Sequence, residues 1–289
     1  MKQLFKLLAI VSPLIFTSCI KNNPDPAWIS VGEWTLLDNP SVDEGELTAN
    51  FTDAWVYVDE KLIGVFEVPF KIPLIKSGSS TIKLYPTVLN NGISATKAQY
   101  PFVEPYIITA DLESNQTVEI QPVTQYYSNC QFTILDFEDA NSGFEDSPSS
   151  LANLVITNDP AIIQPFNGIG FGRVTLTSSL YTWISSTTPD QVLPKSGADV
   201  YMEVDFHNTA DVVTGVLALD GTEVTQNPNV QLNAQDESTV KWKKIYIELK
   251  TIVSGSSAAD SFRQSFEATL PEGVSSAEIN LDNIKIIHF

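Results

Sequence analysis

The sequence predicts an all-β protein of two domains, and three observations carry that prediction. From about residue 31 onward, short runs rich in Val, Ile, Tyr, Phe and Thr are interrupted roughly every 8–12 residues by Gly, Pro, Asn or Asp. The most helix-like segment, residues 257–266, has no sustained apolar stripe and fits a strand equally well. A length of 289 residues is sufficient for one large or two medium domains.

The composition narrows the classes of function. Lys and Arg number 16 against 35 Asp and Glu, which gives a formal charge of −19. Such a chain has too few cations to neutralise a row of phosphates, which argues against general nucleic-acid binding, and charge alone would not hold it on an anionic lipid surface. Apolar residues make up 43% of the chain, so disorder is not expected. With only two His and two Cys, the usual acid–base groups are scarce.

Residues 1–18 have the pattern of an export signal. Lys2 and Lys6 precede a short apolar stretch at 7–16, which is too short for a membrane-spanning helix. Thr17 and Ser18 then precede Cys19, and this arrangement resembles the bacterial lipoprotein box. The resemblance implies that Cys19 is lipidated, becomes the new N-terminus and anchors the chain. An ordinary cleaved signal with an incidental Cys is the alternative.

Residues 19–30 are predicted to be the lipidated Cys and a tether. Positions 22–26 read Asn, Asn, Pro, Asp and Pro, a polar and proline-marked composition that is typical of linkers. The residue after Cys19 is Ile20 rather than Asp, which by the same resemblance implies the outer membrane. Exposure to the periplasm and exposure at the cell surface are both open.

Residues 31–122 are predicted to form a small β-sandwich. The alternation at 54–58 predicts a strand with two unlike faces, and Asp59 and Glu60 begin a hairpin turn. Further strands are expected at 78–86 and within 106–120. The Val-Tyr-Val-Asp run at 56–59 resembles the hairpin of PEGA-type, Ig-like sandwiches, although Glu60 stands where Gly is usual. That resemblance implies an envelope module without catalytic residues.

A linker is predicted at 123–129, followed by a jelly-roll β-sandwich over 130–289. Regularly spaced strand candidates indicate this second fold. They are 132–138, 170–177, 198–207, 214–219, 239–249, 262–270 and 277–288. The first segment, 135–139, and the last, 279–286, resemble the first and last strands of carbohydrate-binding-module-like jelly rolls. Cys130, which would lack an intramolecular partner, is expected at a half-buried strand position.

A structural calcium site is one candidate for a functional constellation. In an antiparallel jelly roll the first and last strands lie close together, so carboxylates from both can converge on one hard cation. The candidate ligands are Asp136, Glu138, Asp139 and Asp282. Acidic residues that merely face water and protect a sheet edge are the alternative, and this is the favoured interpretation.

A sugar-stacking platform is the second candidate. Tyr181 and Trp183 are spaced so that they share one face if their segment is a strand. Tyr201 and Trp242 are weaker candidates. The alternative is that Trp242 and Tyr246 fill the sandwich interior, where most aromatic side chains lie. Catalysis is not indicated, since the sequence has no G-x-S-x-G motif and His207 and His288 lie near strand ends.

Taken together, the lipoprotein box, the PEGA-like block and the jelly roll resemble outer-membrane lipoproteins of the Bacteroidota. We therefore expect a non-catalytic, lipid-anchored envelope protein whose partners are other envelope proteins, as an accessory subunit of an outer-membrane assembly. The alternative is a surface lipoprotein that binds a polysaccharide through its jelly roll. Besides the lipid on Cys19, the only cofactor expected is the possible structural calcium.

Overall fold

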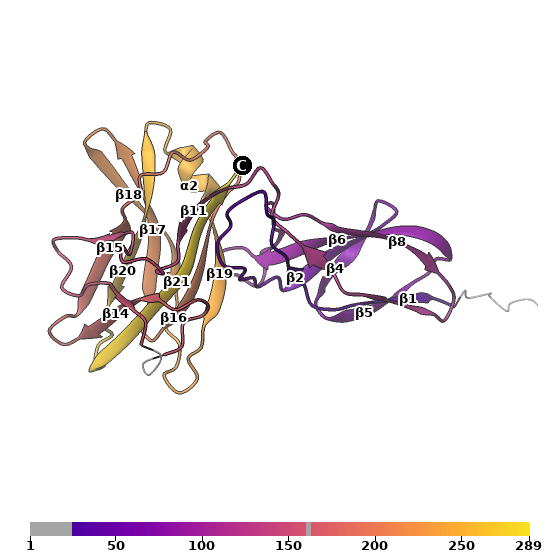
Figure 1. Cartoon of the computed structure of the whole chain (residues 1–289), viewed down its shortest axis with the longest axis horizontal. Coiled ribbons are helices and arrows are strands. Elements are labelled where there is room, and N and C mark those ends of the chain that lie inside the picture. Colours follow the sequence, from indigo (N-terminus) through magenta and orange to yellow (C-terminus); the bar gives the residue numbers. More distant parts are fainter. Residues whose placement is uncertain (1–24, 160–162) are drawn as a thin grey trace, which may run out of the picture.

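The structure, a computed structural model, describes residues 25–159 and 163–289. It consists of two β-sandwiches that lie end to end (Figure 1), which confirms the predicted all-β fold class. Residues 1–18 and Cys19 lie outside the described residues, so the signal peptide and the lipidation stay predictions. Within the described residues, no helix is both long and apolar enough to cross a membrane.

The first sandwich pairs a sheet of order β5-β1-β9 with a sheet of order β4-β3-β6-β7, in which β8 also pairs with β6. The predicted alternation at 54–58 is observed: Ala54, Val56 and Val58 point into the core, and Trp55 and Tyr57 are half-buried. The strands are β1 (Ala27–Val31), β2 (Thr35–Leu36), β3 (Asp53–Val58), β4 (Lys61–Glu67), β5 (Phe70–Leu74), β6 (Gly78–Leu89), β7 (Lys97–Gln99), β8 (Tyr106–Leu112) and β9 (Thr117–Ile120).

The second sandwich contains the larger core. One sheet has the order β13-β14-β21-β16-β19, with β11 also paired to β21, and the opposite sheet has the order β12-β15-β20-β17-β18. Its elements are β11 (Gln131–Leu135), β12 (Phe144–Asp146), β13 (Val155–Thr157), β14 (Phe171–Thr177), β15 (Thr182–Thr187), β16 (Val200–Asn208), β17 (Val212–Asp220), β18 (Glu223–Leu232), β19 (Lys243–Glu248), α2 (Lys250–Gly255), β20 (Ser261–Thr269) and β21 (Ser276–His288).

All seven strand candidates of the second block correspond to observed strands, and the first strand does lie beside the last. Leu135 pairs with Ile284 in the antiparallel register of β11 and β21. The helix-like segment 257–266 leads into strand β20, whereas the short helix α2 lies just before it.

The segment 123–129, predicted to be a linker, contains a short strand at the junction between the sandwiches. Val123 and Thr124 form β10 (Val123–Thr124), which pairs in parallel with β2, and Tyr126 is 1% exposed. The predicted tether also ends earlier than residue 30, because β1 begins at Ala27. Aromatic packing explains the ordered junction, since a hydrophobic cluster draws on both sandwiches. Its buried members are Phe51, Val88, Tyr100, Phe102, Val103, Tyr126, Cys130, Tyr201, Tyr246 and Ile287.

Candidate functional site

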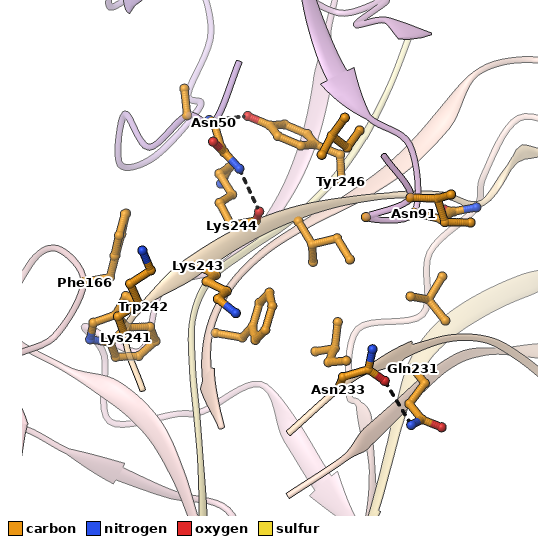
Figure 2. A pocket seen from close by; sticks show the side chains of 18 of the residues that line it. Asn50, Asn91, Phe166, Gln231, Asn233, Lys241, Trp242, Lys243, Lys244 and Tyr246 are labelled. Carbon is orange, nitrogen blue, oxygen red and sulfur yellow. Dashed lines mark hydrogen bonds between the residues drawn. The ribbon is translucent and has the colours of Figure 1, made fainter. Parts of the chain in front are cut away.

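A cleft of about 780 Å³ lies where the two sandwiches meet (Figure 2). One wall is formed by residues 241–246, at the edge strand β19, and another by residues 229–233 at the end of β18. The first sandwich closes it with residues 49–50 and with the loop 89–93. The cleft therefore belongs to neither sandwich alone, and it exists only in the assembled two-domain structure.

The loop 89–93 extends the edge of the second sandwich. The amide of Asn91 donates to the carbonyl oxygen of Tyr246 at 2.9 Å, and the amide of Glu248 donates to Oδ1 of Asn91 at 2.8 Å. Gly92 permits this approach, because it has a φ of +70° and a Cβ there would lie 3.0 Å from Cδ1 of Ile245. Backbone pairing thus fixes one side of the cleft.

Trp242 provides an aromatic surface at one end of the cleft. Its ring is half-buried, and the indole N–H donates to the carbonyl oxygen of Gln164 at 2.8 Å. Edge-to-face contacts with Phe171 and Phe166, at centroid distances of 5.9 and 6.1 Å, hold the ring in place. Phe166 is 38% exposed and adds apolar surface beside it. The orientation of Trp242 is therefore fixed while part of the ring stays accessible.

Amide side chains line much of the remaining surface. They are Asn50, Asn91, Asn229, Gln231 and Asn233. Some are already oriented by neighbours: Asn50 donates through Nδ2 to the carbonyl oxygen of Lys244 at 3.4 Å, and Gln231 donates to Oδ1 of Asn233 at 3.2 Å. Each carboxamide offers both donors and an acceptor, which is the combination that pairs with hydroxyl groups.

The charge of the lining is opposite to that of the whole chain. Lys241, Lys243 and Lys244 line the cleft, and the described lining residues include no Asp, Glu, His or Cys. Lys241 and Lys243 are exposed, whereas Lys244 turns inward and is buried. The described lining therefore offers ammonium, amide and aromatic groups to a ligand.

Lys244 belongs to a buried polar network that joins the sandwiches behind the cleft. Its ammonium lies 3.0 Å from Oε2 of Glu203 and donates to the hydroxyl of Thr48 at 2.8 Å. Tyr100 and Tyr126 donate to Oε1 of Glu203 at 2.5 and 2.8 Å. Thr48, Tyr100 and Tyr126 precede the second sandwich in the chain, so this network fixes the wall of the cleft against the other unit.

The pKa values of this network are set by burial and by the opposite charges nearby. Burial opposes ionisation of Glu203, but Lys244 and Lys285 more than offset it and lower the pKa of Glu203. Burial lowers the pKa of Lys285 to about 8 despite the nearby carboxylates. Burial raises the pKa of Asp282 to about 8, with backbone hydrogen bonds from Asn283 acting in the opposite direction.

The four candidate calcium ligands are not brought together. Within the described residues no group of three or more Asp, Glu, His or Cys side chains is placed to hold a metal. Asp282 is fully buried, and its Oδ1 accepts the amide of Asn283 at 2.8 Å. Glu138 and Asp139 are exposed, and Glu138 instead accepts the amides of Ile169 and Gly170. Asp136 accepts the amide of Glu138 at 3.3 Å. The structure therefore does not show the predicted convergence of these four carboxylates on one point, although β11 and β21 are adjacent.

Tyr181 and Trp183 do not form the predicted sugar-stacking surface. Trp183 is fully buried, stacks on Phe266 at 6.1 Å and donates its indole N–H to Asp146 at 3.0 Å. Tyr181 is 51% exposed and precedes β15, which begins at Thr182. The shared-face argument fails because one of the two residues lies outside the strand. Tyr201 is buried in the junction cluster, which leaves Trp242 as the aromatic candidate that lines a cleft.

Lys241 and Lys243, together with the five amides, were missed by the sequence reasoning. One signal pointed to them: positions 241–244 read Lys, Trp, Lys and Lys in a chain that has few cations. The amides come from segments far apart in the sequence, and no local pattern connects them.

Comparison with known proteins gives similarity in fold only. No protein-family model and no curated protein matches the chain. Solved structures that resemble it include a carbohydrate-binding module of the β-sandwich superfamily, with 17% identity over 80% of this chain and 83% of that one and a TM-score of 0.38. A family 61 module in complex with β-1,4-galactotriose has 12% identity, 54% and 95% coverage and a TM-score of 0.35. A family 28 module specific for non-crystalline cellulose has 14% identity, 52% and 90% coverage and a TM-score of 0.37. Likenesses of this size carry no argument about function.

Proposed function

We propose that this chain binds a glycan without catalysing its breakdown, and that the cleft between the two sandwiches is the binding site. The observation that carries the proposal is the accessible, rigidly held ring of Trp242 at one end of a cleft whose other walls carry amide side chains (Figure 2). Sugars present apolar C–H faces and hydroxyl edges, so an aromatic surface next to carboxamides matches both. The volume of about 780 Å³ is in the range typical of small-ligand sites.

Calorimetric titration of the purified protein, with oligosaccharides selected on a glycan array, tests this proposal. Trp242→Ala should weaken binding by at least about tenfold, which corresponds to about 1.4 kcal/mol. Tyr181→Ala is the matched control, because Tyr181 is exposed and does not line the cleft. Gln231→Ala, at the opposite wall, should weaken binding without disturbing the packing around Trp242. Binding that survives Trp242→Ala and Gln231→Ala unchanged would place the glycan elsewhere.

The location at the outer membrane, through a lipid on Cys19, is part of the proposal. The described chain begins at the end of the first sandwich that is remote from the second (Figure 1). An anchor on that side would hold the cleft one sandwich away from the lipid surface. Metabolic labelling with a fatty-acid analogue, lost in Cys19→Ala, tests the anchor. Protease treatment of intact cells distinguishes the periplasmic side from the cell surface.

An accessory role in an outer-membrane assembly is the other function that the sequence predicts. The cleft favours a glycan, because its described lining combines polar amides with a single accessible aromatic cluster rather than a broad apolar face. Detergent extraction followed by co-purification tests the assembly role. A stoichiometric protein partner whose binding is unaffected by Trp242→Ala would support it alongside the glycan site.

A further inference from the structure

The cleft reverses the charge balance of the chain. The whole sequence carries about two acidic residues for each basic one, yet the described lining of the cleft contains three lysines and no acidic residue. A surface drawn at random from this chain would be acidic. The reversal is therefore a property of this particular surface.

Two of these lysines have charges that no acidic side chain neutralises. Lys76, Lys83, Lys97 and Lys250 form ion pairs with exposed or buried carboxylates. Lys244 is paired with Glu203 inside the protein. Lys241 and Lys243 are exposed and take part in no ion pair within the described residues. Their ammonium groups are thus available to a ligand.

These two lysines lie close to Trp242, so one ligand could contact all three side chains. They flank Trp242 in the sequence, and all three line the cleft. Figure 2 shows Lys241 near Trp242 and Phe166, and Lys243 along the same wall. A sugar stacked on Trp242 would have its ring substituents within the reach of flexible lysine side chains.

We infer that the ligand of the cleft is an acidic glycan, whose sugar units carry carboxylate or sulfate groups. The inference rests on the proposed glycan-binding function. A neutral sugar needs no cation beside its hydroxyl groups, whereas an acidic sugar approaching a chain of charge −19 meets long-range repulsion. Two unpaired ammonium groups offset that repulsion locally and form charge-assisted hydrogen bonds with the acid.

The test uses matched pairs of oligosaccharides and the purified protein. One pair is tetragalacturonic acid and its fully methyl-esterified form, and a second is a sulfated tetrasaccharide and its desulfated form. Each acidic member should bind at least about tenfold more tightly than its neutral counterpart if its acid type is the one recognised, and affinity should fall as salt rises. The two pairs distinguish a carboxylate from a sulfate.

Variants separate the contribution of the lysine charges from that of the Trp242 ring. Lys241→Gln/Lys243→Gln should remove the preference, so that the acidic and neutral members bind with the same affinity. Lys61→Gln/Lys71→Gln alters the net charge equally on exposed residues outside the cleft and should leave the preference intact. Trp242→Ala should weaken both members of the pair.

The outcomes that overturn the inference differ from those that overturn the proposed function. If acidic and neutral members bind equally and only Trp242→Ala weakens them, the site takes neutral glycans and the acidic assignment is wrong. If poly-L-glutamate competes as well as the acidic tetrasaccharide does, the cleft is a general polyanion site. If no glycan on the array, acidic or neutral, binds, both proposals are wrong.

Discussion

The ammonium group of Lys244 lies 3.0 Å from the carboxylate of Glu203, and neither side chain is more than 1% exposed. Both residues come from the second sandwich, but the other oxygen of Glu203 accepts the hydroxyls of Tyr100 and Tyr126. The register of β16 and β21 places Lys285 opposite Glu203 and Asp282 opposite Asp205. Opposed residues share a face of the sheet, and the first segment of the chain contacts this face through the hydroxyl of Thr48 and the carbonyl oxygen of Glu46.

Glu203→Gln should destabilise the whole protein. The substitution keeps the shape of the side chain but removes the nearer of the two carboxylates beside the buried Lys244, leaving Asp205 at 3.7 Å. Breaking a buried ion pair in this way costs about 3–5 kcal/mol. Urea unfolding followed by fluorescence and circular dichroism measures the loss. Because the network joins both sandwiches, we expect one transition in the native protein rather than two.

Glu60→Gln is the matched control. Glu60 pairs with Lys83 at 2.5 Å, but its side chain is 74% exposed. Exposed pairs contribute little to stability, about 0–1 kcal/mol. A cost for Glu203→Gln no larger than that for Glu60→Gln would contradict the structural role of the buried pair, as would two separate transitions in the native protein.

Asp282 should make the stability of the protein depend on pH. Burial raises its pKa to about 8 in the folded state, whereas the unfolded carboxyl titrates near 3.9. Between these values the native state binds more protons than the unfolded state. The free energy of unfolding therefore falls as the pH rises from about 4 to about 8. Asp282→Asn imitates the protonated form and should remove this part of the dependence.

The comparison of the native protein with Asp282→Asn is best made at pH 5 and pH 8. The variant should have nearly native stability at pH 5 and be more stable than the native protein at pH 8. Lys285 acts mainly at higher pH: burial lowers its pKa to about 8, so its contribution rises with pH between about 8 and 10.5. An equal difference between the two proteins at both pH values would mean that Asp282 is ionised throughout.

Local patterns predicted much of the architecture because strand-forming runs and turn residues act over short distances. The hairpin at Asp59 and Glu60 was predicted, and the structure has both residues at positive φ, 46° and 65°. Strand β18 was not predicted. Its sequence is polar, contains Pro228 and is mostly exposed, which is typical of an edge strand and gives no hydrophobic alternation to detect.

The site was harder to predict because it depends on tertiary placement. The weaker candidate Trp242 lines the cleft, while Tyr201, a candidate of the same chemical type, is buried at the junction. No periodicity in the sequence distinguishes these two residues. Their burial depends on which part of the second sandwich is covered by the first. The burial of Asp282 likewise depends on tertiary placement, because Asn283 and the segment 166–167 surround its carboxylate.

Trp183→Ala should destabilise the protein far more than Tyr181→Ala. Trp183 is fully buried and donates a hydrogen bond to Asp146, so its truncation should cost about 3–5 kcal/mol. Tyr181 is 51% exposed, and its truncation should change stability by about 0.5 kcal/mol or less. Denaturant unfolding of both variants measures this. Similar costs for the two would contradict the burial of Trp183 in the core of the second sandwich.

Cys130 should report on the opening of the junction. It is 6% exposed within the cluster that joins the sandwiches, and its thiol donates to the carbonyl oxygen of Phe102 at 3.4 Å. Burial raises its pKa to about 12, so the reactive thiolate is scarce at pH 8. In a Cys19→Ser background, where Cys130 is the single thiol, a disulfide reagent should react at least about a thousandfold more slowly with the folded protein than with the urea-unfolded protein. Adding Glu203→Gln should accelerate the reaction, because it weakens the network beside the cluster. Rapid stoichiometric labelling of the folded protein would instead show that the sandwiches separate freely, and the cleft would then not be a fixed surface.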